Sequence, residues 1–153
     1  MQPRFEYHKT GIAGLKPLQD LEKYLHGCGL EASLLELVKM RASQINGCAY
    51  CLDVHSKDAR AKGETEQRLY GLDAWREAPF YTERERAALD WTEAVTRVAD
   101  THVPDEVYER VKRHFNEQEL FNLTLAIIAI NGWNRLSISS RTVAGTYKPK
   151  LAK

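Results

Sequence analysis

Hydrophobic residues recur every three or four positions along almost the whole chain, which is the spacing of amphipathic α-helices. Stretches that alternate apolar and polar residues between turn signals are missing, and Asn46-Gly47 lies between two helical patterns rather than in a hairpin. The pattern therefore predicts an all-α protein. We expect its helices at about 17–26, 31–45, 47–63 and 66–75, from Thr82 onward, from Pro104 onward, and at about 120–138.

Polar residues mark the ends of several of these helices. Thr82 with Glu85, and Asn116 with Glu119, have the spacing of a capping box, in which each side chain bonds the other residue's backbone N–H. Gly63 suits the end of the third helix. No repeat, linker or low-complexity segment divides the chain, so we expect one domain over residues 1–153.

The last expected helix begins with apolar residues on every side, from Leu120 to Ile130. Such a helix is typically buried rather than exposed along one face. A small domain rarely surrounds a helix by itself, so we expect an oligomer with this helix at a subunit interface. The alternative is a central helix in a monomeric bundle.

Composition narrows the functional classes. The chain has 153 residues, of which 43% are hydrophobic and 28% charged, enough to bury a core. Its 22 basic and 21 acidic residues give a formal net charge of +1, which argues against nucleic-acid binding. No apolar run follows the N-terminal arginine, and the stretch 120–130 is too short to span a bilayer. We expect a soluble, cytoplasmic protein with no membrane contact and no cofactor.

Two of the three cysteines belong to a C-x-x-C-x-x-x-H motif formed by Cys48, Cys51 and His55. At about 100° per residue, these side chains project from one face of the third helix within an arc of about 60°. Residues three apart on a helix have Cβ atoms about 5–6 Å apart, so the two thiols can form and open a disulfide without large backbone motion. The motif predicts a redox or peroxidase dithiol beside an imidazole.

Spacing alone leaves several alternatives open. The helix N-terminus favours ionisation of Cys48, whereas His55 can take the proton of Cys51, so either sulfur could attack first. A zinc site with the same three ligands is a second interpretation, although no second pair of cysteines or histidines would complete it. A buried structural pair is the third. A thioredoxin-like fold is disfavoured because its motif follows a strand.

The residues around the motif resemble the alkylhydroperoxidase AhpD core of the carboxymuconolactone decarboxylase family. The resemblance rests on Glu36 at its distance from Cys48, on the cysteine–histidine motif, and on the downstream segments 56–63, 75–82, 85–89 and 131–135. It covers about residues 30–140 and implies a helical subunit that assembles into trimers or hexamers.

The resemblance also implies thiol-dependent reduction of hydroperoxides. By analogy, Cys51 is the peroxidatic thiol, Cys48 is the resolving thiol, and Glu36 and His55 form the proton relay. Such enzymes need an external dithiol reductant, for example a lipoyl group on a partner protein. Two alternatives remain: a decarboxylase acting on a cyclic lactone acid, which does not need a dithiol, and a non-catalytic redox-sensing or zinc-binding helical oligomer.

Two positions stand out against this background. Tyr50 replaces the histidine that the best-studied branch carries between the cysteines, and tyrosine is a poor base near neutral pH because its unperturbed pKa is about 10. Glu36 lies opposite the apolar stripe of Leu34 and Val38, so without the resemblance it would be interpreted as solvent-exposed.

The remaining candidates are weaker. We expect Cys28 to be structural or incidental, and Tyr81 and Trp133 to be core residues more often than pocket residues. The other histidines and two arginine pairs are expected on the surface: His8, His26, His102 and His114, with Arg84, Arg86, Arg110 and Arg113.

Overall fold

The computed structural model describes residues 2–149, which form nine α-helices and one 3-10 turn without a β-strand. The all-α prediction is therefore confirmed. In chain order the elements are α1 (Tyr7–Thr10), α2 (Ile12–Leu25), α3 (Ala32–Asn46), α4 (Ala49–Ala61), α5 (Glu66–Tyr70), η1 (Gly71–Ala74), α6 (Glu83–Thr96), α7 (Val98–Thr101), α8 (Asp105–Val111) and α9 (Glu117–Ser140).

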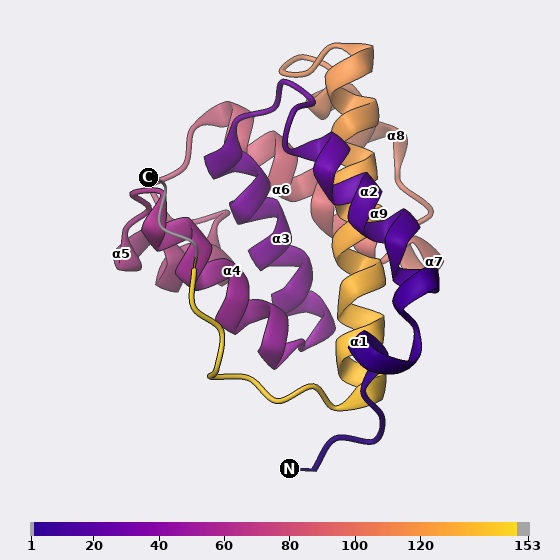
Figure 1. Ribbon diagram of the computed structural model, residues 1–153. Helices are drawn as coiled ribbons and strands as arrows, with labels where there is room; N and C mark the ends of the chain where they lie inside the picture. Colours follow the sequence, from indigo (N-terminus) through magenta and orange to yellow (C-terminus); the bar gives the residue numbers. More distant parts are fainter. Residues whose placement is uncertain (1, 150–153) are drawn as a thin grey trace.

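Helix α3 lies at the centre of the bundle, between α4 on one side and α9 on the other (Figure 1). It also packs against α6, and every residue from Leu34 to Ser43 is buried. The buried stretch includes the charged residues Glu36, Lys39 and Arg41. Each of these side chains is held by an oppositely charged partner, which compensates for the loss of water.

Helix α9 is only partly enclosed within the single chain. It contacts α2, α3, α4 and α6, yet Phe121, Ile128 and Ile138 are 58%, 52% and 45% exposed. The surrounding helices cover only part of its circumference, so α9 is not a central helix enclosed within the single chain, and its expected place at a subunit interface stays a prediction. The helix that is enclosed all round is α3.

The helix boundaries agree closely with the capping signals. Both capping boxes form, at Thr82 with Glu85 and at Asn116 with Glu119. The first long helix was expected from residue 17 but begins at Ile12, and Pro17 lies within it on the exposed side. A proline there removes one helical hydrogen bond without ending the helix. The short helix α1 has no counterpart among the expected elements.

None of the helices in the described part of the chain is both long and apolar enough to cross a lipid bilayer.

A buried polar contact joins the C-terminal half of α3 to α9. The side-chain nitrogen Nδ2 of Asn134 donates to Oγ of Ser43 at 3.0 Å, and its Oδ1 accepts from Nδ2 of Asn46 at 2.8 Å.

We expect Asn134→Ala to lower the free energy of unfolding by about 2–3 kcal/mol, because both bonds are lost inside the protein. Urea denaturation measures this change. The exposed control Ser33→Ala should stay within about 0.5 kcal/mol, and an equally small effect of Asn134→Ala would contradict the role of the contact.

Candidate active site

The turn between α3 and α4 places the first cysteine. Gly47 has φ +68°, a left-handed conformation that glycine adopts without strain. Cys48 follows as the N-cap of α4, with its backbone N–H donating to the carbonyl of Ser43 at 3.0 Å. Its Sγ accepts from the backbone N–H of Cys51 at 3.3 Å. Cys48 is thus held at the positive end of the α4 dipole rather than inside the helix.

Cys48 and Cys51 are joined by a disulfide, with Cα atoms 5.4 Å apart. This separation lies in the usual range for disulfides, so the prediction that the two residues are close enough to bridge is confirmed. The residues are 1% and 3% exposed, respectively. Both residues are therefore shielded from bulk water.

His55 follows Cys51 by one turn of α4, and its Nδ1 lies 3.0 Å from Oε2 of Glu36 on α3. Glu36 is 4% exposed. Its interpretation as a solvent-exposed residue, based on its place opposite the stripe of Leu34 and Val38, is therefore wrong. Helix α4 covers that face of α3, so both faces of α3 are buried. The four expected site residues are brought together from two adjacent helices.

The carboxylate of Glu36 is held in its ionised form. Burial by itself would raise the pKa of Glu36, but the hydrogen bond and charge of His55 and the hydrogen bond of Lys62 lower it to about 2. Lys62 Nζ lies 2.6 Å from Oε1. Because an ionised carboxylate only accepts hydrogen bonds, Nδ1 of His55 carries the hydrogen between them. In a neutral ring, Nε2 is then the proton acceptor.

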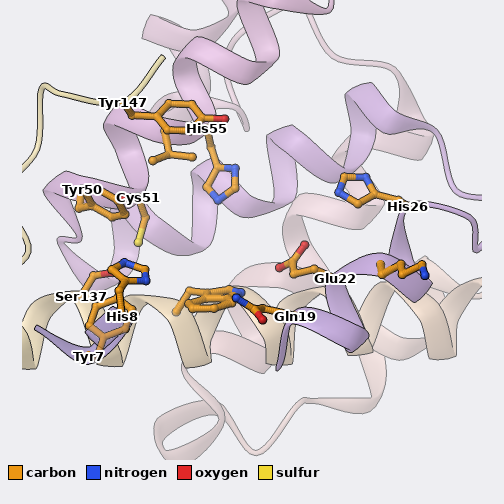
Figure 2. A pocket seen from close by; sticks show the side chains of 13 residues that line it. Tyr7, His8, Gln19, Glu22, His26, Tyr50, Cys51, His55, Ser137 and Tyr147 are labelled. Atoms are coloured by element: carbon orange, nitrogen blue, oxygen red, sulfur yellow. The ribbon is translucent and has the colours of Figure 1, made fainter. Parts of the chain in front are cut away.

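A cavity of about 430 Å³ opens beside Cys51 and His55 (Figure 2). This size suits a small organic molecule. The walls come from α1, α2, α4, α9 and the C-terminal segment, so the cavity exists only in the folded chain. Its lining residues are Tyr7, His8, Gln19, Glu22, Lys23, His26, Tyr50, Cys51, Val54, His55, Trp133, Ser137 and Tyr147. Of the two cysteines, Cys51 is the one that faces it.

The segment after α9 returns across α4 (Figure 1). The backbone N–H of Gly145 donates to Asp53 Oδ2 at 2.9 Å, and Lys57 Nζ donates to the carbonyl of Tyr147 at 3.0 Å. The Tyr147 hydroxyl donates to Asp58 Oδ1 at 2.8 Å. Burial and this hydrogen bond raise the pKa of Tyr147 to about 12, so it stays protonated. Its ring closes one side of the cavity near His55 (Figure 2).

Tyr50 also lines the cavity, between the two cysteines in sequence. Burial, followed by the charges of Tyr7 and Asp53, raises the pKa of Tyr50. Its hydroxyl therefore remains protonated near neutral pH, where it can donate a hydrogen bond but cannot act as a base.

Three side chains could coordinate a metal ion within the described part of the chain. Ligand atoms of Glu36, His55 and Asp58 lie within 4.8 Å of one another. The ammonium group of Lys62 already contacts Glu36, so a cation would compete with it. The zinc interpretation used Cys48 and Cys51 instead, and these sulfurs cannot serve as thiolate ligands while they are bonded to each other.

The weaker candidates divide between core and cavity. Tyr81 is a buried core residue, and Trp133 lines the cavity. Cys28 is partly buried against the main core cluster, as expected for a structural residue. His8 and His26 are exposed, as predicted, but both also line the cavity.

The arginines of α6 are not the solvent-exposed charges expected from the sequence. Arg84 is partly buried and pairs with Glu31 and Glu119, at 2.9 Å and 2.8 Å. Arg86 is also partly buried and donates to backbone carbonyls, including that of Trp75 at 2.8 Å. Arg84 therefore joins segments that are distant in sequence, whereas Arg86 holds the turn just before α6, and helical spacing reveals neither contact.

Sequence reasoning missed three residues of the site. Lys62 follows His55 by seven residues, about two helical turns, and as the C-cap of α4 it lies on the same side as His55, where both contact Glu36. Extending the motif by two turns would have found it. Tyr7 and Tyr147 reach the cavity from the two ends of the chain. No local pattern marks them, because their positions depend on tertiary packing.

Comparison with known proteins identifies relatives along most of the chain. The sequence profile described as the carboxymuconolactone decarboxylase family matches residues 15–94. The uncharacterized protein YdfG of Bacillus subtilis is 45% identical over 139 residues, which cover 91% of this chain and 95% of that protein.

Two solved structures also resemble this chain. A protein of unknown function from Agrobacterium tumefaciens, named as a candidate AhpD antioxidant defence protein, has a TM-score of 0.92 and 42% identity, covering 95% of this chain and 100% of that one. An uncharacterized peroxidase-related protein from Silicibacter has a TM-score of 0.78 at 22% identity, covering 89% and 72% of the respective chains. The second likeness concerns the fold alone.

Proposed function

The chain belongs to the carboxymuconolactone decarboxylase family, and on that premise we propose that it is a thiol-dependent peroxidase of the alkylhydroperoxidase type. One observation carries the proposal. Cys51 is bonded to Cys48, precedes by one turn a histidine that contacts a buried carboxylate, and faces a cavity of about 430 Å³. A structural cysteine pair would need neither the histidine nor the cavity.

The reaction begins with the reduced protein. His55 takes the thiol proton of Cys51 on Nε2, which is free because Nδ1 donates to Glu36. The thiolate gains further stabilisation from the nearby positive end of α4. Glu36 stabilises the resulting imidazolium, as buried carboxylates do beside other catalytic histidines. With a pKa of about 2, Glu36 stays ionised, so His55 is the group that carries the proton.

The Cys51 thiolate then attacks the terminal oxygen of a hydroperoxide, ROOH. A sulfur–oxygen bond forms and the oxygen–oxygen bond breaks. The departing alkoxide takes the proton that His55 accepted from the thiol. The products are the sulfenic acid of Cys51 and the alcohol ROH, so the sulfur is oxidised and the peroxide is reduced.

Cys48 completes the oxidative half of the cycle. Its thiol attacks the sulfur of the Cys51 sulfenic acid, a disulfide forms, and water leaves. The Cα separation of 5.4 Å in the disulfide form is close to that of residues three apart on a helix, which supports closure without a backbone rearrangement.

An external dithiol closes the cycle. Thiol–disulfide exchange turns it into a disulfide and returns Cys48 and Cys51 to thiols. The net reaction converts ROOH and a dithiol into ROH, water and a disulfide. We assign the reductant to a lipoyl group on a partner protein, a dithiol small enough to reach the cavity. The cytoplasm, which keeps such dithiols reduced, is the compartment that fits this cycle.

Turnover with defined reagents tests the proposal. We expect the purified protein to consume cumene hydroperoxide with dihydrolipoamide as reductant, forming one lipoamide disulfide for each hydroperoxide reduced. Protein whose reduced thiols have been blocked with iodoacetamide is the control and should be inactive. A single oxidation without turnover would instead support a redox sensor, and stoichiometric zinc in the reduced protein would support a zinc-binding oligomer. Either result would overturn the peroxidase proposal.

Oligomerisation is part of the same proposal. The exposed apolar residues Phe121, Ile128 and Ile138 of α9 suit burial against further copies of the chain, in the trimer or hexamer that the family resemblance implies.

A further inference from the structure

Lys62, at the C-terminal end of α4, takes no part in the chemistry described so far. Its Nζ lies 2.6 Å from Oε1 of Glu36, and its side chain is 40% exposed. Cys48 is the N-cap of α4 and Lys62 is its C-cap, with His55 between them. The segment therefore carries a sulfur at one end, an imidazole within the helix and an ammonium group at the other end.

Glu36 bridges the last two of these groups. One carboxylate oxygen, Oε2, lies 3.0 Å from Nδ1 of His55, and the other, Oε1, accepts from Lys62. A carboxylate held by a donor on each oxygen cannot rotate freely about its terminal bond, and charge-assisted hydrogen bonds of this kind are the stronger ones. The position of Lys62 is thereby linked to the orientation of the His55 ring.

Other charged groups near Glu36 do not duplicate this contact. Lys39, on the same helix, lowers the pKa of Glu36 through its charge, but its hydrogen bond goes to Glu22 of α2 at 2.7 Å. Asp58 on α4 lies close to both Glu36 and His55, but it is a second anion. Among the described residues, the lysine in direct contact with the Glu36 carboxylate is Lys62.

We propose that Lys62 is a positioning residue for the thiol chemistry and acts through Glu36. It holds the carboxylate so that Oε2 meets Nδ1–H of His55, which fixes the ring tautomer and keeps Nε2 free to accept the Cys51 proton. The proposal rests on the proposed function. A Lys62–Glu36 pair that only stabilised the fold would leave the tautomer and thiol reactivity unchanged when it was removed.

Three variants separate these roles. Lys62→Met removes the charge and the donor but keeps an unbranched side chain. Lys62→Arg keeps both the charge and the donor. Lys112→Met makes the same charge change at the exposed pair with Glu109, on the helix α8 side of the molecule, and is the matched control.

The first measurement needs no turnover. Nitrogen-15 NMR of the reduced protein at about pH 8.5, where an ordinary histidine is neutral, reports the His55 tautomer. We expect the form with hydrogen on Nδ1 to dominate in the unsubstituted protein, Lys62→Arg and Lys112→Met. Lys62→Met should give a mixture of the two tautomers, because the carboxylate, no longer held at Oε1, can turn away from Nδ1.

The second measurement is the alkylation of Cys51 by iodoacetamide, in a background carrying Cys28→Ser and Cys48→Ser so that one thiol reacts. Lys62→Met should slow this reaction about tenfold at about pH 7, the order expected for loss of a charged hydrogen bond. The fall in rate on acidification should move to higher pH, because a carboxylate that Lys62 no longer holds stabilises the imidazolium–thiolate pair of His55 and Cys51 less well. Lys62→Arg should restore the rate.

A native circular-dichroism spectrum with an unchanged tautomer and rate in Lys62→Met would overturn the positioning role. If Lys62→Met does not fold, Lys62→Gln replaces it with the same expected directions, because it removes the charge. If the unsubstituted protein showed no hydroperoxide turnover but Lys62→Met still changed the His55 tautomer, the peroxidase proposal would be refuted and the role of Lys62 supported. The two failures are therefore distinguishable.

Discussion

We expect Cys51→Ser to abolish hydroperoxide turnover, lowering the rate by at least about 10³-fold, while the helical fold persists. A serine hydroxyl ionises far less readily than a thiol and is a much weaker nucleophile toward oxygen. The substitution exchanges sulfur for a smaller oxygen at one buried position on α4, so little packing is lost. Steady-state turnover measures the first effect. Circular dichroism and thermal unfolding of both proteins under reducing conditions measure the second.

The two other cysteines provide matched controls. Cys48→Ser should still consume one equivalent of hydroperoxide and accumulate a sulfenic acid on Cys51, because attack precedes resolution. Cys28→Ser should keep full activity, since Cys28 packs against the core away from the pair. The reverse pattern would contradict our assignment. If Cys48→Ser consumed no hydroperoxide while Cys51→Ser still consumed one equivalent, the attacking thiol would be Cys48.

We expect Glu36→Gln to reduce turnover by about 10²-fold or more. Glutamine has the shape of glutamate, but it cannot stabilise the imidazolium that His55 forms, and it leaves Lys62 without an anionic partner. Its amide nitrogen can also meet Nδ1 of His55 and favour the wrong tautomer. The comparison with Lys112→Met, which removes a charge at the exposed pair with Glu109 outside the cavity, shows whether the loss is specific to the site.

The same substitution should change the acid stability of the protein. Because the folded-state pKa of Glu36 is lowered from 4.5 to about 2, the ionised carboxylate stabilises the fold above about pH 4.5 and this contribution is lost as the pH falls toward 2. At about 1.4 kcal/mol per pKa unit, this carboxylate adds about 3 kcal/mol to the free energy of unfolding at neutral pH. Glu36→Gln should therefore be destabilised most at neutral pH, and the gap should narrow in acid. Urea unfolding over a series of pH values measures this, and a gap independent of pH would contradict it.

Local spacing was sufficient for the fold class and for part of the site. The three- and four-residue periodicity predicted helices, and the Thr82–Glu85 and Asn116–Glu119 pairs located two helix starts, because both features act within one or two turns. Cys48, Cys51 and His55 could be placed on a common face for the same reason, since all three belong to one short segment. Continuing that face to Lys62 needed only the same rule.

Tertiary packing decided which of these groups work together. Spacing along α3 placed Glu36 on its polar face, and only the docking of α4 against that face turned an apparently solvated glutamate into a buried partner of His55. The cavity walls join Tyr7 to Tyr147 across nearly the whole chain. Helical periodicity specifies which side of a helix is polar, but removal of water depends on what packs against that side. That removal determines which charges must be paired, and hence which side chains can take part in the chemistry.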